Sequence, residues 1–365
     1  MAVKKLKIGI IGCGGIANGK HMPSLKLLPD VSMVAFCDII EERAIKAAKD
    51  YGTADAKVYT DYRKLLEDKT IDIVHVLTPN KEHSEISVAA LNADKHVMCE
   101  KPMAKSYAEA QKMLKAYQEA HKRSGKLLTI GYQSRHMVQS QTLKAICERG
   151  DLGEIYYAKA LALRRRGVPT WGVFMDEEEQ GGGPLIDIGT HALDLTLWLM
   201  DNYKPKSVMG NVYKKLRADG NCGNDFGPWD PKKFTVEDSA FGFITMQNGA
   251  TISLESSWAI NLADVREATT ILCGTKGGAD FSDGLRINGA DLGSLYLRKV
   301  DTHKGGVAFY EGVNNGKCEQ VEAARWINAV RKSKLPVVLP EQAIVVTQLL
   351  EAIYTSAKTG ELVTF

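Results

Sequence analysis

The stretch "GIIGCGGIANGK", from Gly9 to Lys20, places Gly12, Gly14 and Gly15 directly after an apolar run and before a helical pattern. A loop that only reverses the chain needs one glycine. Several glycines close together leave the backbone bare, so that another molecule can lie against it. The stretch therefore predicts a binding loop rather than a simple turn.

The spacing within this loop is that of a dinucleotide-binding motif, G-x-G-x-x-A, which runs from Gly12 to Ala17 and includes Gly15 and Ile16. The first glycine permits the tight turn, and Gly14 lets the backbone approach a pyrophosphate. Ala17 allows close packing of helix on strand, and the N-terminus of that helix favours phosphate. The motif predicts a nucleotide cofactor.

Asp38 identifies which cofactor is expected. It ends the second predicted strand, about 20 residues beyond the glycines, where the motif places an acidic residue. Its carboxylate can accept hydrogen bonds from the ribose hydroxyls and would repel a 2′-phosphate. Ile39 and Ile40 follow it, with no cation that could bind such a phosphate. The sequence therefore predicts NAD rather than NADP.

The first 125 or so residues alternate short apolar strands with helix-length segments. Strands that are apolar on both faces indicate a parallel sheet covered by helices on both sides, an α/β doubly wound fold. We expect the strands at 6–12, 31–38, 57–59, 71–78, 96–101 and 126–132.

Further candidate cofactor contacts follow two of these strands. In an open parallel sheet, ligands bind outside the carboxyl ends of the strands. The residues that the sequence places at those ends are Thr78, Pro79, Asn80, His83, Glu100 and Lys101. A salt bridge from Lys101 to Glu100 at the surface is the alternative reading of that pair.

After about residue 150 the pattern changes to longer strands with little helix between them, which predicts an α+β domain with a large open antiparallel sheet. Asn248-Gly249 is a strong hairpin signal between two of these strands. Both alternating faces of 155–163 are apolar. We therefore expect helices on one face and a second subunit on the other. Helices at 317–333 and 340–358 complete the chain.

Composition limits the function classes. A chain of 365 residues suggests two domains, which we expect at 1–130 (dinucleotide-binding) and 131–365 (substrate-binding and oligomerisation), with the last helices as candidates to pack back on the first domain. A net charge of +3 gives no reason to expect nucleic acid. The seven cysteines form no CxxC pair, which favours a reducing compartment without a metal site. With no signal peptide and no membrane-spanning run, we expect a cytoplasmic protein.

Three motifs in order resemble the Gfo/Idh/MocA oxidoreductases: the glycine loop, Glu100-Lys101-Pro102, and "GGGPLIDIGTHALDLTLWL" at 181–199. The resemblance covers essentially the whole chain. It implies a Rossmann domain followed by an α/β domain with an open sheet, assembly as a dimer or tetramer, and a cis Lys101-Pro102 bond. It also implies that Lys101, Asp187 and His191 line the catalytic pocket, and that the stretch Tyr132, Gln133, Ser134, Arg135 borders nicotinamide and substrate.

The same three residues suit the oxidation of a secondary alcohol. Asp187 and His191 are four apart and share a face in a helical turn. A neutral imidazole can take the hydroxyl proton near pH 7, while Asp187 orients it or grips a neighbouring hydroxyl. Lys101 can relay the proton or stabilise the alkoxide. Whether Lys101 or His191 is the formal base is open.

For the substrate, Trp171 offers a ring that can stack on a sugar, Arg166 lies nearby, and Trp258 is a second candidate wall. An interface or core role is the alternative for Trp171. The leading hypothesis is an NAD-dependent dehydrogenase of a sugar, glycoside or cyclitol, with glycosides slightly favoured over inositols. Two alternatives are a glycoside hydrolase that retains NAD and a non-catalytic nucleotide sensor. The presence of Lys101, Asp187 and His191 counts against the sensor.

Overall fold

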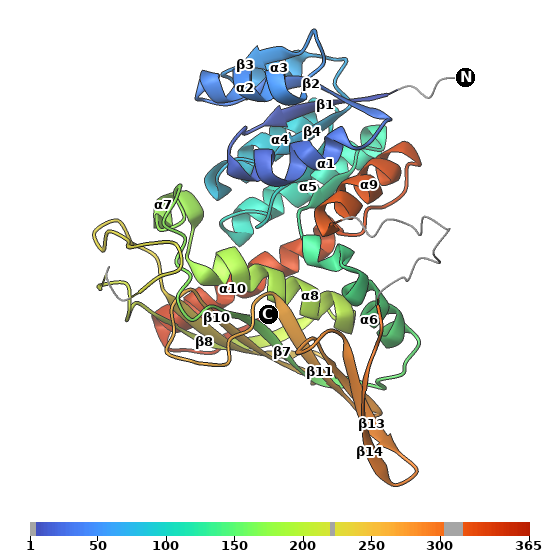
Figure 1. Ribbon diagram of the computed structural model, residues 1–365, viewed down its shortest axis with the longest axis vertical. Coiled ribbons are helices and arrows are strands. Elements are labelled where there is room, and N and C mark those ends of the chain that lie inside the picture. Colours follow the sequence, from blue (N-terminus) through green and yellow to red (C-terminus); the bar gives the residue numbers. More distant parts are fainter. Residues whose placement is uncertain (1–4, 220–222, 303–316) are drawn as a thin grey trace. The chain divides into compact units, whose positions relative to one another are not determined.

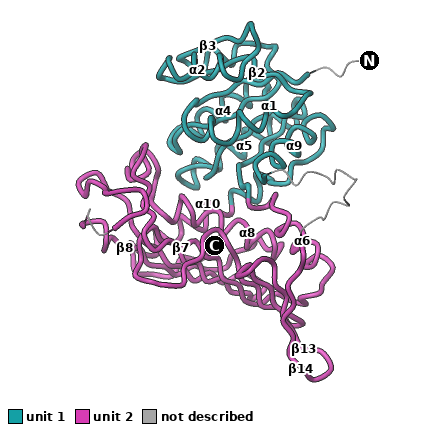
Figure 2. The backbone as a smooth tube through the Cα atoms, viewed as in Figure 1, with its two compact units in different colours: residues 1–133, 316–344 teal, residues 134–315, 345–365 magenta. Residues whose placement is uncertain are grey.

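The computed structural model describes residues 5–219, 223–302 and 317–365, which form two compact units, each built on its own sheet. Unit 1 comprises residues 1–133 and 316–344, and unit 2 comprises residues 134–315 and 345–365 (Figure 2). The chain therefore leaves unit 1, builds most of unit 2, and returns to unit 1 before it ends in unit 2.

Unit 1 contains six parallel strands in the order β3-β2-β1-β4-β5-β6, which confirms the predicted doubly wound sheet (Figure 1). Their bounds are β1 Leu6–Ile11, β2 Val31–Cys37, β3 Lys57–Tyr59, β4 Ile73–Val76, β5 His96–Cys99 and β6 Leu128–Ile130. The helices of this unit are α1 Met22–Lys26, α2 Glu41–Tyr51, α3 Tyr62–Glu67, α4 His83–Asn92, α5 Tyr107–Ser124 and α9 Cys318–Arg331. Helix α10, Pro340–Thr359, begins in unit 1 and continues in unit 2.

The helical pattern that follows the glycine loop in the sequence is not one continuous α-helix in the structure. A π-helical turn, η1, spans Ala17–His21 and precedes α1. Turns of this kind are rare and often occur at functional sites. The turn brings Lys20 and His21 into the interior of unit 1, where both are buried. Apolar periodicity alone does not reveal such a turn.

Helix α9 belongs to the core of unit 1 although about 300 residues of sequence separate it from β1. Its Trp326 and Ile327 are buried in one cluster with Ile8, Met22 and Leu25. Burial of large apolar side chains is the dominant favourable term in folding. The helix is thus an integral layer of the cofactor-binding fold.

Unit 2 contains a nine-stranded sheet in the order β14-β13-β12-β11-β7-β10-β9-β8-β15. The bounds are β7 Ile155–Leu163, β8 Pro205–Tyr213, β9 Ser239–Met246, β10 Thr251–Ser257, β11 Thr269–Gly274, β12 Gly277–Asp280, β13 Arg286–Asp291, β14 Ser294–Lys299 and β15 Val363–Thr364. The sheet is mixed rather than wholly antiparallel, because β10 pairs with β7 in parallel. This follows from the topology: β8, β9 and β10 form an antiparallel meander, and its last strand adds beside β7.

The predicted hairpin is present, with Thr245 paired to Thr251 across the turn and Gly249 at a φ of +88°. Helices α6 Val138–Glu148, α7 Glu177–Gln180 and α8 Thr190–Met200 also belong to unit 2. Helices α8 and α10 lie on one side of the nine-stranded sheet (Figure 1). Helix α10 approaches the sheet closely, since a Cβ added at Gly242 would stand 2.6 Å from Ile353.

Among the described residues, no helix is both long enough and apolar enough to cross a bilayer. The six cysteines within those residues are free thiols. Within the same ranges, no group of three or more His, Cys, Asp or Glu side chains could hold a metal ion.

Candidate active site

The glycine loop has the shape that a bound pyrophosphate requires. Gly12 has a φ of +90°, and a Cβ there would stand 2.5 Å from the Leu77 carbonyl oxygen. Gly14 and Gly15 face open space instead, since no neighbouring atom lies within 4 Å of a Cβ added at either residue. The first glycine is therefore demanded by the fold, and the next two leave open space over bare backbone.

Asp38 lies beside this loop with its carboxylate held by backbone. Oδ2 accepts from the Cys13 amide at 2.8 Å and Oδ1 accepts from the Ile40 amide at 2.9 Å. Each oxygen of an ionised carboxylate has a second acceptor position, so both can still receive a ribose hydroxyl. The loop and this fixed carboxylate together fit a dinucleotide.

His83 connects two of the strand ends that the sequence singles out. Its Nδ1 lies 2.8 Å from the Pro102 carbonyl oxygen and its Nε2 lies 3.0 Å from that of Thr78. The ring is 1% exposed, and this burial lowers the pKa of His83. His83 therefore acts as a brace between the two loops. Asn80 is buried and Pro79 precedes the short 3-10 turn Asn80–Glu82.

Glu100, predicted to contact the cofactor, instead has its carboxylate inside unit 1. Oε1 accepts from Lys20 at 2.7 Å and lies 2.7 Å from Nε2 of His21, while Oε2 accepts from the Lys101 amide at 3.0 Å. The Lys101-Pro102 bond is cis, as the resemblance implies. No sequence motif marks Lys20 or its second partner, Glu322 on α9.

In unit 2 a second π-helical turn carries the other predicted catalytic residues. This turn, η4, spans Leu185–Gly189 and runs directly into α8, so Asp187 lies on the turn and His191 is the second residue of α8. Asp187 accepts a 3.1 Å hydrogen bond through Oδ2 from Nε1 of Trp258. Trp258 is 0% exposed. It is therefore not an open wall for a sugar, as proposed from the sequence, but a buried donor that orients Asp187.

The glycine run before this turn is anchored by Glu237. The Gly183 and Leu185 amides donate to its two carboxylate oxygens at 2.9 and 3.2 Å, and the Tyr354 hydroxyl donates to Oε1 at 2.8 Å. A Cβ at Gly183 would stand 2.4 Å from the Glu237 carbonyl oxygen. Burial raises the pKa of Glu237. The glycines thus let the chain approach this carboxylate closely enough to fix the turn.

Arg135, predicted to border the substrate, is 0% exposed. Its Nε donates to Oδ2 of Asp194 at 2.9 Å, and a terminal nitrogen donates to Oδ1 at 2.6 Å. This buried bidentate pair joins the short turn Gln133–His136 to α8 and has a structural role. Tyr132 is also fully buried, whereas Gln133 is partly exposed.

Trp171 lies in an exposed aromatic cluster on the loops of unit 2. Its ring centroid is 4.8 Å from that of Phe226 and 5.9 Å from that of Phe174. Trp171 is 52% exposed and Phe226 is 46% exposed. The Thr170 hydroxyl fixes the cluster by donating to the Phe226 carbonyl oxygen at 2.7 Å. Arg166 donates to Oδ1 of Asn261 at 2.6 Å.

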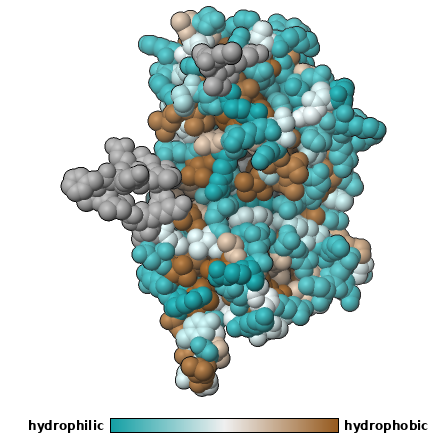
Figure 3. All heavy atoms as spheres, turned by 90° about the vertical axis from the view of Figure 1, so that its right-hand side faces the viewer, coloured by the Kyte–Doolittle hydropathy of each residue, from teal (hydrophilic) through white to brown (hydrophobic). Residues whose placement is uncertain are grey.

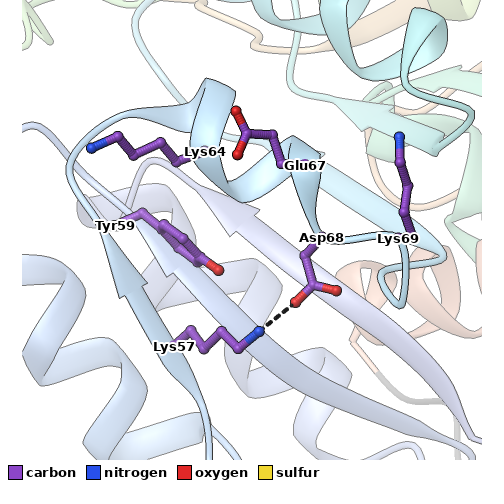
Figure 4. A pocket seen from close by; sticks show the side chains of 6 residues that line it. All are labelled: Lys57, Tyr59, Lys64, Glu67, Asp68 and Lys69. Atoms are coloured by element: carbon purple, nitrogen blue, oxygen red, sulfur yellow. Dashed lines mark hydrogen bonds and ion pairs between the residues drawn. The ribbon is translucent and has the colours of Figure 1, made fainter.

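A surface depression at the edge of the unit 1 sheet lies apart from these residues (Figure 4). It is lined by Lys57, Tyr59, Lys64, Glu67, Asp68 and Lys69. An ion pair of 2.9 Å between Lys57 and Asp68 holds the pKa of that carboxyl below its usual value. None of the six residues carries a predicted role, and their charges largely compensate one another.

Two family models match the chain. One, described as an oxidoreductase family with an NAD-binding Rossmann fold, matches residues 6–127, and the other, a GFO/IDH/MocA C-terminal domain, matches residues 140–280. Among curated proteins, D-glucoside 3-dehydrogenase of Escherichia coli is 36% identical over 99% of this chain and 97% of its own. Inositol 2-dehydrogenase of Salmonella typhimurium is 32% identical over 56% of this chain and 57% of its own.

Solved structures share the whole fold. An oxidoreductase domain protein from Kribbella flavida superposes with a TM-score of 0.84 at 24% identity, covering 99% of each chain. A levoglucosan dehydrogenase in complex with NADH and levoglucosan gives 0.81 at 22% identity, again covering 99% of each chain.

Proposed function

This chain belongs to the Gfo/Idh/MocA family of NAD-binding oxidoreductases, and we propose that it oxidises a secondary hydroxyl of a glucoside, with hydride transfer to NAD. The observation that carries this choice is the likeness to D-glucoside 3-dehydrogenase over nearly the full length of both chains. The likeness to inositol 2-dehydrogenase extends over about half of each chain, so cyclitols are the second candidate substrates.

The cofactor is NAD, and when bound it supplies the hydride acceptor. Residues Gly12 to Ala17 would hold its pyrophosphate, and the Asp38 carboxylate would accept hydrogen bonds from the ribose hydroxyls. Its negative charge excludes a 2′-phosphate, for which the adjoining Ile39 and Ile40 offer no cation. Thr78, Pro79, Asn80 and Gln133 complete the cofactor contacts. Unit 1 is thus the cofactor-binding unit, and unit 2 carries the substrate.

The hydroxyl proton leaves to His191 or to Lys101 as the C–H bond breaks. Asp187 is aimed by Trp258, and from the π turn it holds the imidazole or a second hydroxyl of the sugar. The Lys101 ammonium stabilises the negative charge that develops on the substrate oxygen. A neutral imidazole and a positioned carboxylate are a common pair for general base catalysis.

The substrate extends over the exposed rings of Trp171 and Phe226. Aromatic faces suit the apolar faces of sugar rings, and the hydrogen bonds of the two loops hold this cluster in place. Arg166, which donates a hydrogen bond to Asn261, borders the same loops.

We further propose that the protein works in the cytoplasm as a homo-oligomer. The face of the nine-stranded sheet away from the helices exposes Met209, Tyr213 and Phe243 by 38–54%. Apolar side chains this exposed on a broad sheet mark a protein contact.

The test is a panel of α- and β-glucosides, free sugars and inositols offered with NAD and followed by NADH absorbance. Glucosides should be oxidised fastest, and Lys101→Ala and His191→Ala should bind NAD by fluorescence quenching yet turn over roughly 10²–10⁴-fold more slowly. Faster oxidation of inositols would transfer the assignment to cyclitols. Glycoside cleavage without accumulation of NADH would instead identify a hydrolase that retains NAD.

A further inference from the structure

A buried ammonium between two carboxylates lies next to the Glu100-Lys101-Pro102 turn. Nζ of Lys20 is 2.7 Å from Oε1 of Glu100 and 2.9 Å from Oε2 of Glu322. The three side chains are 4–9% exposed. They come from three separate segments: the π turn η1, the end of β5 and helix α9.

Such a cluster is poor evidence for stability. Removing charges from water costs several kcal/mol per ion, and apolar side chains of the same size often stabilise as well or better. Stability alone is therefore a weak explanation for this buried cluster, and we look for a role in positioning a neighbouring group.

The cluster makes direct contact with Lys101. The second oxygen of Glu100 accepts from the Lys101 amide at 3.0 Å. On the other side Gly131 leaves room for the carboxylate, since a Cβ added there would stand 3.1 Å from Oε1. The Glu100 carboxylate is thus confined between Gly131, the Lys20 ammonium and the Lys101 amide. Any displacement of the carboxylate would shift the Lys101 backbone.

We propose that Lys20 and Glu322 are positioning residues that hold the Glu100 carboxylate against the Lys101 amide and so fix where the Lys101 ammonium stands. This inference rests on the proposed function, because it takes Lys101 to act on the substrate.

The charges of the cluster fit this role. Burial raises the pKa of Glu100, but Lys20 and His21 outweigh it and hold that pKa well below its usual range. Burial raises the pKa of Glu322, and its Oε1 is buried without a hydrogen-bond partner among the described residues. Burial therefore acts in the same direction on both carboxylates, and only at Glu100 do the neighbouring cations outweigh it.

Other titratable groups near Glu100 are His83, whose pKa burial lowers, the Cys99 thiol, whose pKa burial raises, and His75 of β4. Nδ1 of His75 lies 3.3 Å from Nδ1 of His21. Burial lowers the pKa of His75 well below its usual value, so it brings no charge. Glu100 therefore depends on Lys20 and His21 to stay ionised.

Lys20→Met removes the main counter-charge. Turnover should fall by roughly 10²-fold, the effect of a misplacement of about 1 Å in a catalytic group. Because the pKa of Glu100 rises when the cation is lost, the acid-side decline of turnover should begin at a higher pH in Lys20→Met than in the wild type. The dissociation constant for NAD, measured by fluorescence quenching, should change little.

Two variants of Glu322 separate the effect of its negative charge from the effect of its oxygen acceptor for Lys20. Glu322→Ala removes the support of Lys20 and should lower turnover. Glu322→Gln keeps an oxygen that can accept from Lys20, so it should recover most of that loss. If Lys20→Met does not fold, this pair carries the test by itself.

The matched control is Lys95→Met. Lys95 is another buried lysine of unit 1, 2% exposed, whose Nζ donates to the carbonyl oxygens of Asp68 and Ile71 at 2.7 and 2.8 Å. Its loss should lower the melting temperature without changing the pH profile of turnover. Equal behaviour of Lys20→Met and Lys95→Met would overturn the proposal.

A readout that needs no substrate keeps this test distinct from that of the proposed function. The rate at which Lys101 is acetylated by acetic anhydride, measured by peptide mass spectrometry, should change in Lys20→Met and Glu322→Ala but not in Lys95→Met. An unchanged labelling rate would refute the positioning role even if the enzyme is active. An inactive wild type with altered labelling would refute only the proposed function.

Discussion

At the scale of single residues, we propose that Asp38 sets the choice between NAD and NADP. Its carboxylate is already held by two backbone amides, so it meets a ribose without reorganising. Asp38→Ala should weaken NAD binding by roughly 1.5–3 kcal/mol, the usual loss for a hydrogen bond to a charged group, and should relax discrimination against NADP. Titrations of both cofactors by fluorescence quenching measure this. Faster turnover of the wild type with NADP at equal low concentrations would contradict it.

Trp258 should matter through its N–H group rather than its bulk. Trp258→Phe keeps an apolar ring in the core and removes the 3.1 Å donor to Asp187. We expect kcat/KM to fall roughly tenfold or more, as for a lost hydrogen bond to a carboxylate, with little change in melting temperature. Trp229→Phe is the control, since this buried indole donates to the Arg217 carbonyl oxygen. Equal losses in both variants would reduce Trp258 to a packing residue.

A site residue could be predicted from the sequence when its role depends on neighbours along the chain, and could not when its partner is distant in sequence. The glycine loop and Asp38 are readable because their roles depend on local spacing. The pairing of Lys20 with Glu322 spans about 300 residues, and that of Arg135 with Asp194 is fixed only by the packed fold. A buried lysine and a surface lysine look the same in a sequence. The sequence therefore identifies the motif Glu100-Lys101-Pro102 and misses the cluster that holds it.

At the scale of elements, both predicted site helices begin with a π turn, η1 in unit 1 and η4 in unit 2. The hydrophobic pattern of "IANGKHMPSL" and "GPLIDIGTHALDL" predicts helices there but cannot separate five residues of π geometry from α geometry. In both cases the turn begins next to a glycine-rich stretch that is held by other parts of the fold. We attribute the π geometry of η1 and η4 to the fixed positions of the glycine-rich stretches that precede them.

The aromatic loops of unit 2 make a prediction about substrate affinity. Trp171→Ala should raise KM for glucosides several-fold and leave kcat nearly unchanged, because stacking on a sugar binds ground state and transition state alike. Phe226→Ala should do the same more weakly, and Trp171→Phe should retain most of the affinity. Steady-state kinetics on the best glucoside decide the matter. A loss of kcat at constant KM would show that the cluster shapes the reacting centre.

Strand β5 carries a prediction about pH. Burial, with a smaller contribution from Lys126, lowers the pKa of His96 to about 4, against 6.5 for a free imidazole. Its Nδ1 accepts from the Leu127 amide at 3.2 Å, and protonation removes that acceptor. The unfolded chain therefore binds the proton more readily. The stability contribution is complete above pH 6.5 and is lost as the pH falls toward 4, at up to roughly 1.4 kcal/mol per pH unit.

His96→Gln should flatten this acid-side loss, as followed by melting temperature between pH 7 and 4. His121→Gln, on the exposed end of α5, is the control and should keep the wild-type pH dependence. Parallel curves for the wild type and His96→Gln would show that other groups govern acid unfolding.

At the scale of the whole molecule, the register of the unit 2 sheet explains which face is open. Ala158 and Ala160 of β7 are fully buried on the face of α8, and Ile244 of β9 shares that face. At the alternate positions, Phe243 and the paired Met209 are exposed, whereas Leu161 and Leu163 of β7 are buried. The two apolar faces of 155–163 can be read from the sequence because alternation is a local property, and the cover of one of them by a second subunit stays a prediction. The sequence cannot show how far the open face extends.

That face continues into the hairpin of β13 and β14, which extends away from the rest of the sheet (Figure 1). Leu295 and Leu297, 90% and 61% exposed, lie by register on the same side as Phe243. Hydrophobic side chains are visible at the tip of the hairpin, at the bottom of Figure 3. An apolar surface of this extent on one face is rare in a monomer.

We therefore expect a second copy to cover this face. Sedimentation at micromolar concentration should show a species of at least twice the 40.0 kDa chain mass. Introducing charge by Met209→Glu with Phe243→Glu should dissociate it, because two buried carboxylates without partners would be costly in the contact. Leu335→Glu is the control, since Leu335 is 60% exposed and belongs to unit 1 rather than to the sheet of unit 2. A wild type that sediments at 40.0 kDa would show that the open face is not a contact between copies.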